Sequence, residues 1–156
     1  MPITLRDVLP ADEPFLFEVY ASTRAEEMAL VPWNEEQRQS FLTMQFAAQH
    51  SHYREQFPDA NYSVILGDDQ AVGRLYVLKD KTETRILDIT VLPEYRNRGI
   101  GTSLLQGLLD EASHSGKRVL IYVETFNPSL RLFERLGFRS MAEEGFNFLM
   151  EWGSVE

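Results

Sequence analysis

The sequence predicts an α+β fold in which a central mixed sheet carries helices on both faces. Short runs rich in β-branched and aromatic residues indicate strands, and longer segments with apolar residues three or four apart indicate helices. Turns containing glycine or proline separate these segments. The expected order is β-α-α-β-β-β-α-β-α-β-β, and the 156 residues, 44% of them hydrophobic, suit a single domain over 1–156.

One strand and the first of two helices are expected at the start of the chain. The strand covers 3–8, where apolar and polar residues alternate. Asp12 is a suitable cap for the first helix. The apolar face of this helix comprises Phe15, Leu16, Val19 and Tyr20. Residues 22–33 have no clear period and are interpreted as a loop.

The second helix is expected to begin at a capping box formed by Asn34 and Gln37 and to end near Gln56. Its predicted inward face consists of Phe41, Met44, Ala47 and Ala48. Strands over 62–66 and 71–78 follow, and a tight turn at 67–69 joins them into a hairpin.

The second half of the chain is organised around 86–109. A β-branched run over 86–92 predicts a buried strand, which Pro93 ends because proline has no N–H to donate to a ladder. A charged loop with two glycines follows. An amphipathic helix comes next, with an apolar face of Leu104, Leu105, Leu108, Leu109 and Ala112.

Three further elements complete the predicted fold. A buried strand is expected over 119–123. A short helix follows, with Asn127 as its cap and Pro128 in its first turn. The last two strands, 138–141 and 146–150, form a closing hairpin.

The junction of strand, glycine loop and helix is suited to bind a phosphate group. The first turn of a helix leaves backbone N–H groups unpaired, and the helix dipole adds partial positive charge there. Glycines let an anion approach the main chain, and Arg96 and Arg98 add full positive charges. Because positive charge near a helix N-terminus is unfavourable without an anion, binding is favoured over a solvated surface role.

The glycine spacing decides which phosphate loop this is. A Walker loop needs a lysine after its last glycine, where Thr102 stands here, and a dinucleotide fingerprint needs a glycine where Leu104 stands. The pattern Arg96-x-x-Gly99-x-Gly101 instead resembles the pyrophosphate-binding motif of the GNAT superfamily of N-acetyltransferases, Gln/Arg-x-x-Gly-x-Gly/Ala.

A second block supports the resemblance. The segment from Asn127 to Leu136-Gly137-Phe138 is similar to the late motif of the superfamily, an Asn followed by a short helix ending in Leu-Gly-Phe. The resemblance covers 72–152 well and the first half only in outline. It implies a GNAT-like fold, whose element order is the one expected here.

The resemblance implies that acetyl-coenzyme A enters between two parallel strands that splay apart, 86–92 and 119–123. The loop would hold the pyrophosphate, and backbone groups of Val91 would pair with the pantetheine arm. Apolar Leu92 would pack along this arm, and Asn127 would bond to it. The residues implied to bind coenzyme A are Val91, Leu92, Arg96, Asn97, Arg98, Gly99, Ile100, Gly101, Thr102, Asn127 and Phe133.

The implied reaction is direct transfer of an acetyl group to an amine, which must lose a proton to attack. In the superfamily a tyrosine of the last helix often protonates the leaving thiolate, but Phe133 stands at that position and has no proton to donate. Asp88 and Glu124 are candidate bases, because an apolar strand disfavours the ionised carboxylate. The alternatives are an ion pair of Asp88 with Arg74 or Arg85, and a favourable position of Glu124 before the following helix.

The expected function is therefore acetyl-CoA-dependent N-acyl transfer to a primary amine of a small molecule, peptide or protein. The alternative is a non-catalytic coenzyme A or acyl-CoA sensor of the same fold, which Phe133 leaves open. A nucleotide-phosphate-binding protein of another fold is disfavoured by the Leu-Gly-Phe block. The residues that could line an acceptor cleft are Trp33, His50, Tyr53, Tyr62 and Phe126.

Composition limits the possible partners. The net charge of −9 disfavours nucleic acid and anionic membranes and mildly favours cationic acceptors. No cysteine is present for disulfides or thiol chemistry, and His50 and His52 diverge on a helix, so no metal site is expected. Without a bilayer-length apolar stretch or a signal peptide, a cytoplasmic location is expected. A homodimer is also considered, because dimers are common in the superfamily.

Overall fold

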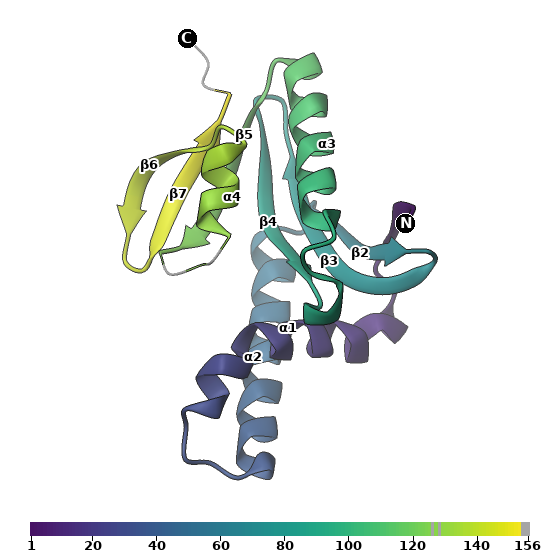
Figure 1. The fold of residues 1–156 in the computed structure, drawn as a ribbon, viewed down its shortest axis with the longest axis vertical. Helices are drawn as coiled ribbons and strands as arrows, with labels where there is room; N and C mark the ends of the chain where they lie inside the picture. Colours follow the sequence, from purple (N-terminus) through teal and green to yellow (C-terminus); the bar gives the residue numbers. More distant parts are fainter. Residues whose placement is uncertain (126, 128, 154–156) are drawn as a thin grey trace.

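The computed structural model describes residues 1–125, 127 and 129–153. The strands of this part of the chain form one seven-stranded sheet in the order β1-β2-β3-β4-β5-β7-β6 (Figure 1). Only the β4–β5 pair is parallel among these neighbours, so the sheet is mixed as predicted. The strands are β1 Ile3–Asp7, β2 Asn61–Gly67, β3 Gln70–Lys79, β4 Glu83–Val91, β5 Arg118–Glu124, β6 Arg139–Glu144 and β7 Asn147–Trp152.

Helices cover both faces of the sheet, which confirms the predicted layers (Figure 1). Adjacent residues of a strand point to opposite faces of the sheet. In β3, Leu75 shares a core cluster with leucines of α3, whereas the ring of Tyr76 meets Tyr53 of α2. The α-helices are α1 Glu13–Ala29, α2 Glu35–Gln56, α3 Ile100–Ser115 and α4 Leu130–Arg135, and short 3₁₀ turns are η1 Pro10–Asp12 and η2 Pro93–Tyr95.

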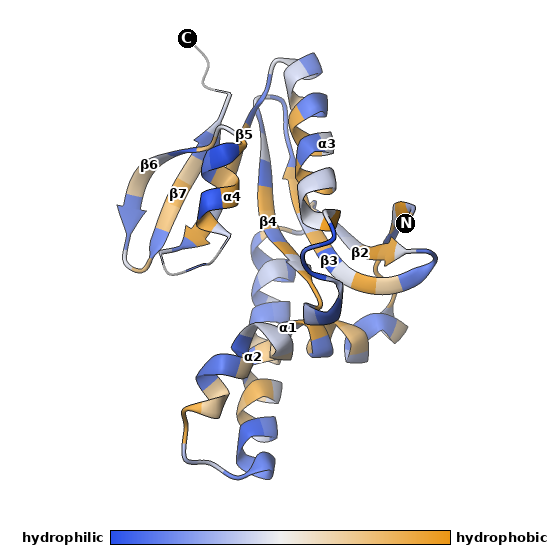
Figure 2. Cartoon of the chain, viewed as in Figure 1, coloured by the Kyte–Doolittle hydropathy of each residue, from blue (hydrophilic) through white to orange (hydrophobic). Residues whose placement is uncertain are grey.

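Two hydrophobic clusters hold these layers together. The larger one joins α3 and α4 to the central strands, and Figure 2 shows the hydrophobic stretches of those strands. Its α3 members are Ile100, together with Leu105, Leu109 and Ala112, which lie on the predicted apolar face. The smaller cluster contains Leu16, Tyr20 and Phe46 and joins α1 to α2. The predicted inward face of the first helix is confirmed in Leu16, Val19 and Tyr20.

The interpretation of residues 22–33 as a loop is wrong for 22–29, because α1 continues to Ala29, and is confirmed for 30–33. Arg24, Ala25 and the two glutamates that follow are all good helix formers, and no proline interrupts the chain before Pro32. Met28 is also buried, so the extension has its own apolar anchor. The hydrophobic period of this segment is weak because this part of the helix is mostly exposed, and not because its backbone is irregular.

The start of α2 is as predicted, but its inward face is not. Asn34 and Gln37 form the reciprocal capping box, with N···O distances of 2.8 and 3.0 Å. Met44 is 62% exposed, and Ala47 and Ala48 are exposed as well. The buried residue is Phe46, 5% exposed, because its ring packs against the aromatic rings of α1.

Two predicted helix caps differ in the structure. The Asp12 carboxylate does not cap α1; it accepts two 2.7 Å bonds from the Arg6 guanidinium and one from the Leu9 N–H. These bonds, led by the one from Arg6, hold the pKa of Asp12 below its usual value. Helix α4 begins at Leu130 rather than directly after Asn127. Phe126 and Pro128, for which an acceptor-lining and a helix-starting role were predicted, lie outside the described residues.

We expect Gly73→Ala to destabilise the fold, because a Cβ at this position would collide with the backbone carbonyl oxygen of Thr90 on β4. The expected cost is about 1–3 kcal/mol in the free energy of unfolding, measured by urea denaturation. Gly107→Ala is the matched control, since its Cβ meets nothing within 4 Å on α3. That variant should gain about 0.5–1 kcal/mol. Equal stability of the two variants would contradict the close approach of β3 and β4.

Candidate active site

The site is built around the point where β4 and β5 separate. The parallel pairing joins residues 83–86 of β4 to residues 118–121 of β5 and ends at the pair Ile86–Ile121. Beyond it, β4 stays with β3, and the Leu92 N–H still donates to the Val72 carbonyl at 2.8 Å. β5 stays with β7 as far as the pair Glu124–Asn147. Residues 87–91 of β4 and 122–124 of β5 thus no longer pair with each other, and we call these two strand ends the fork.

A β-bulge in β4 accounts for the fork. The register with β3 runs from Val77–Ile86 to Tyr76–Asp88 and skips Leu87, which is therefore the extra residue. A bulge bends its strand and increases the local twist. The bulge follows directly after the last β4–β5 pair, so β4 turns away from β5 at the residue where their pairing ends. The splayed strands implied by the GNAT resemblance are thus present.

The predicted phosphate loop lies at the end of β4 and leads into α3. Gly99 has φ of +81° and precedes the helix, a conformation that glycine adopts without strain. The first bond of the helical ladder runs from the Ser103 N–H to the Gly99 carbonyl at 2.9 Å. The N–H groups of the three residues between them therefore precede the ladder, at the positive end of the helix dipole. A Cβ added at Gly99 or Gly101 would meet nothing within 4 Å, so the main chain here is accessible.

The two arginines of the loop are exposed, and each has a local contact. The Arg96 Nε donates to the Val91 carbonyl at 2.9 Å, which uses one of the five guanidinium N–H donors. The Arg98 guanidinium lies 5.5 Å from the centre of the Tyr95 ring. Both arginines therefore stay next to the start of α3, where their charges add to that of the helix dipole.

The remaining residues implied to bind coenzyme A have different surroundings. Leu92 is buried in the protein rather than exposed along the fork. Asn127 lies after the end of β5 and accepts a 2.8 Å bond from the Ser129 N–H with its side-chain oxygen. Phe133 is 3% exposed and packs edge-on against Phe138 at 5.6 Å between ring centres. Its cluster also contains the leucines of α3, so α3 and α4 flank the same core.

Asp88 is held in an ion pair, which is one of the alternatives considered for it. Arg74 lies on the neighbouring strand, is 2% exposed, and donates to Asp88 Oδ2 at 2.7 Å. The Thr90 hydroxyl donates to Asp88 Oδ1 at 2.6 Å, and Arg74 also donates to Gln49 of α2 at 3.0 Å. Burial lowers the pKa of Arg74, but the charge and hydrogen bond of Asp88, together with Tyr76 and Tyr53, outweigh burial and raise that pKa overall. Both carboxylate oxygens of Asp88 are therefore occupied.

Glu124 is the less constrained of the two candidate bases. It ends β5 at the fork, and its side chain is 41% exposed. The Arg24 guanidinium of α1 approaches it at 3.8 Å and is also paired with Glu27 at 3.1 Å. A long, half-exposed contact of this kind contributes little to stability and leaves the carboxylate available.

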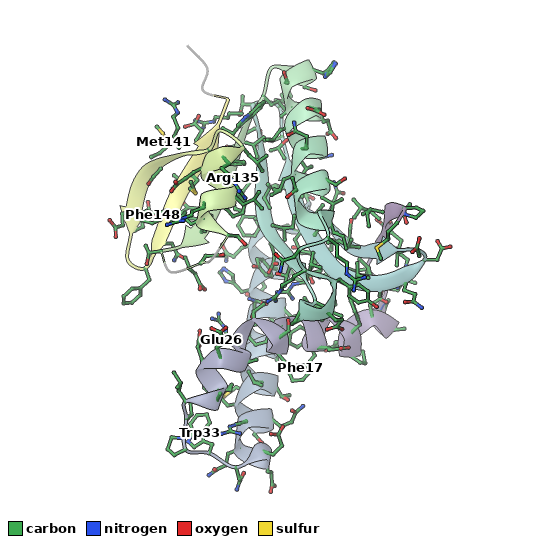
Figure 3. All side chains as sticks on the ribbon, in the orientation of Figure 1. Phe17, Glu26, Trp33, Arg135, Met141 and Phe148 are labelled. Atoms are coloured by element: carbon green, nitrogen blue, oxygen red, sulfur yellow. The ribbon has the colours of Figure 1, made fainter. Side chains whose placement is uncertain are left out.

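The residues expected to line an acceptor cleft do not all come together. Trp33 packs against Phe41, and Figure 3 places it at the end of the helix pair α1 and α2, away from the sheet. His50 borders a cavity of about 310 Å³ between the start of α1 and α2. The Tyr62 hydroxyl donates to backbone carbonyls of Tyr53 and Phe57. Tyr53 alone among these four reaches β4, where its hydroxyl donates to the Leu87 carbonyl.

Residues 22–138 match the profile of the acetyltransferase (GNAT) family. The chain belongs to this family. The match spans the end of α1, all of α2, the phosphate loop and the Leu-Gly-Phe block, so it includes the fork and both motifs that flank it. The family is one of acetyltransferases, which agrees with the resemblance found in the motifs.

Solved structures show the same GNAT fold. A PaiA N-acetyltransferase from Thermoplasma acidophilum in complex with coenzyme A has a TM-score of 0.72 at 21% identity, over 99% of this chain and 100% of that one. The ribosomal-protein-S18-alanine N-acetyltransferase from Escherichia coli has a TM-score of 0.64 at 18% identity, over 99% and 96%. Naa50 from Arabidopsis thaliana, in complex with a bisubstrate analogue, has a TM-score of 0.60 at 18% identity, over 97% and 98%.

Across 1–125, 127 and 129–153, no three His, Asp or Glu side chains gather where they could hold a metal ion. The helices of the same ranges include none that is long and apolar enough to cross a membrane.

Sequence analysis missed three groups near the fork, namely Gln49, Thr90 and the bulge at Leu87. Thr90 follows Asp88 by two residues on the same strand, so both side chains share one face of the sheet, and this spacing could have suggested their contact. No local signal marks Gln49, because it reaches the sheet only through the packing of α2. The bulge has no sequence mark either, since leucine is an ordinary strand residue.

We expect Arg74→Met to lower the free energy of unfolding by about 3–5 kcal/mol, because it leaves the Asp88 carboxylate unpaired below α2. Adding Asp88→Leu should recover most of that loss, since no buried charge then remains. Arg85→Met is the control on the next strand, where the 3.8 Å contact with Glu83 should contribute no more than about 1 kcal/mol. Urea denaturation of Arg74→Met, Asp88→Leu, their double variant and the Arg85→Met control measures the coupling. Additive effects at Arg74 and Asp88 would contradict the ion pair.

Proposed function

We propose that this GNAT protein is an acetyl-CoA-dependent N-acetyltransferase that moves an acetyl group directly to a primary amine. The observation that carries the proposal is the fork, whose two unpaired backbone edges lie between α3 and α4 with the glycine loop at one end. The family match supports the chemistry. The coenzyme A complex of a structural neighbour with the same fold supports the choice of co-substrate.

The residues of the loop fit the pyrophosphate of coenzyme A. The open main chain at Gly99 and Gly101 lets two phosphates approach, and the N–H groups of Ile100, Gly101 and Thr102 are placed to donate to them. Arg96 and Arg98 add charge, and Asn97, at φ of +63°, turns the chain between them. Backbone groups of β4 up to Val91 then form one edge for the pantetheine arm, and Asn127 lies at the end of the opposite edge.

Acetyl-CoA would supply the acetyl group as an activated thioester. The acceptor amine needs a group that takes its proton, and Glu124 is better placed for this than Asp88. Its carboxylate is half-exposed at the end of β5, whereas both Asp88 oxygens are already bonded. Asp88 then serves to hold β4 against β3 through Arg74. Because Phe133 has no hydroxyl, the leaving thiolate takes its proton from water.

The acceptor we propose is the amine of a small molecule or of a peptide. Two neighbours support the peptide class, because one is named for the alanine of a ribosomal protein and another is bound to a peptide-containing bisubstrate analogue. The net charge of −9 favours an acceptor with positive charge over a nucleic acid. A cytoplasmic location and a homodimer stay predictions of the sequence.

A coenzyme A or acyl-CoA sensor is the second candidate function. The observation that favours it is Phe133, which is packed in the core at the position where the superfamily often has a proton donor. A sensor would keep the glycine loop and the fork without efficient turnover. The two functions share the binding site and differ in whether free thiol is released in the presence of an amine.

Calorimetric titration with acetyl-CoA tests the binding site. We expect micromolar binding and a loss of at least about tenfold in Gly99→Leu, because a side chain there fills the space over the α3 N-terminus. Gly116→Leu is the matched control. It also has positive φ and open space, but it lies at the opposite end of α3. Similar affinity of the two folded variants would refute the phosphate-loop assignment.

We expect Phe133→Tyr to leave acetyl-CoA affinity within about twofold and to raise the rate of thiol release, because a hydroxyl can donate a proton to the thiolate. The measurement is thiol release with a panel of primary amines. Phe138→Tyr controls for a new buried hydroxyl beside the same ring contact. An unchanged rate in a folded Phe133→Tyr variant would show that thiolate protonation does not limit turnover.

A further inference from the structure

We propose that Tyr53 of α2 is a positioning residue that holds the bulge of β4 and so sets the angle between the two arms of the fork. The inference rests on the proposed function, because the fork is where the acyl-pantetheine arm would lie. It assigns a role in acyl-CoA binding to a helix on the opposite face of the sheet from the phosphate loop and α3.

Leu87 is the residue through which Tyr53 sets the direction of β4. It has no partner in the register with β3, and it follows the last parallel pair, Ile86–Ile121. The backbone at Leu87 thus belongs to neither ladder, and a strand is least fixed where ladder bonds end. The conformation of this one residue decides the direction in which Asp88, Ile89 and the rest of β4 continue.

Tyr53 supplies a bond that the ladders do not. Its hydroxyl donates to the Leu87 carbonyl at 3.3 Å. Burial, followed by the nearby charge of Asp88, raises the pKa of Tyr53, so the phenol keeps its proton and remains a donor at neutral pH. A partly buried carbonyl without a donor is unfavourable, which gives this bond its importance.

The Tyr53 ring is itself firmly placed. It meets the Tyr76 ring edge-on, with 5.4 Å between ring centres, and Tyr76 is the β3 residue opposite Asp88. At the backbone of the same residue, the Tyr53 carbonyl accepts a 2.7 Å bond from the Tyr62 hydroxyl of β2. Tyr53 therefore connects the bulge to β3 and β2.

Tyr53 and Tyr62 provide a matched pair of variants. Tyr53→Phe keeps the ring contact with Tyr76 and removes only the hydroxyl that reaches Leu87. Tyr62→Phe also removes a buried hydroxyl, and it loses the bonds to the carbonyls of Tyr53 and Phe57 without touching β4. A structural effect on α2 alone would appear in both variants, whereas an effect on the fork would appear only in Tyr53→Phe.

The test compares two ligands by calorimetry on the full chain. Acetyl-CoA reaches both the phosphate loop and the fork, whereas adenosine 3′-phosphate 5′-diphosphate carries the pyrophosphate but no pantetheine arm. In Tyr53→Phe we expect acetyl-CoA affinity to fall roughly threefold to tenfold, the effect of one lost hydrogen bond, with the affinity for the nucleotide unchanged. In Tyr62→Phe we expect the ratio of the two affinities to stay at the wild-type value.

The outcomes separate this proposal from the proposed function. A wild-type protein that binds neither ligand contradicts the coenzyme A site itself. A wild-type protein that binds both, with an unchanged affinity ratio in Tyr53→Phe, overturns the positioning role and leaves the proposed function intact. The same change of ratio in both tyrosine variants also overturns it, because the effect would then come from α2 as a whole.

Discussion

The structure depends on the short parallel pairing between β4 and β5, which ends at Ile86–Ile121. Each strand keeps its antiparallel partner on the other side, β3 for β4 and β7 for β5, so the two can separate without losing more than one ladder each. The separation produces unpaired backbone edges next to the N-terminus of α3. Both the glycine loop and the candidate base Glu124 take their positions from it.

Sequence analysis predicted the features whose cause is local. The loop was found because its glycines and arginines stand together between a strand and a helix, and α3 was found because its leucines recur on one face. The environment of Asp88 could be stated only as alternatives. Its partner Arg74 lies on another strand, and the register of β3 against β4, with a bulge between them, decides whether the two side chains meet.

The errors in the first half have a different physical origin. The end of α1 carries few apolar residues, so its helical backbone is set by propensity and by one buried residue, Met28, rather than by a visible period. In α2 the choice of inward face depends on which residue meets the aromatic rings of α1, and Phe46 was not distinguishable from Phe41 before the helices were packed. Acceptor-binding residues of the first half are hard to predict for the same reason.

The position of β7 has a consequence for the order in which the chain can fold. β7 follows β6 in the sequence, yet it lies between β5 and β6 in the sheet. The edge of β5 that faces away from β4 therefore stays open during synthesis until residues 147–152 have emerged, while β2 to β4 can already pair through neighbouring hairpins. An exposed strand edge invites wrong pairing. β5, the strand of the fork that carries Glu124, is thus the last of the two to gain its antiparallel neighbour.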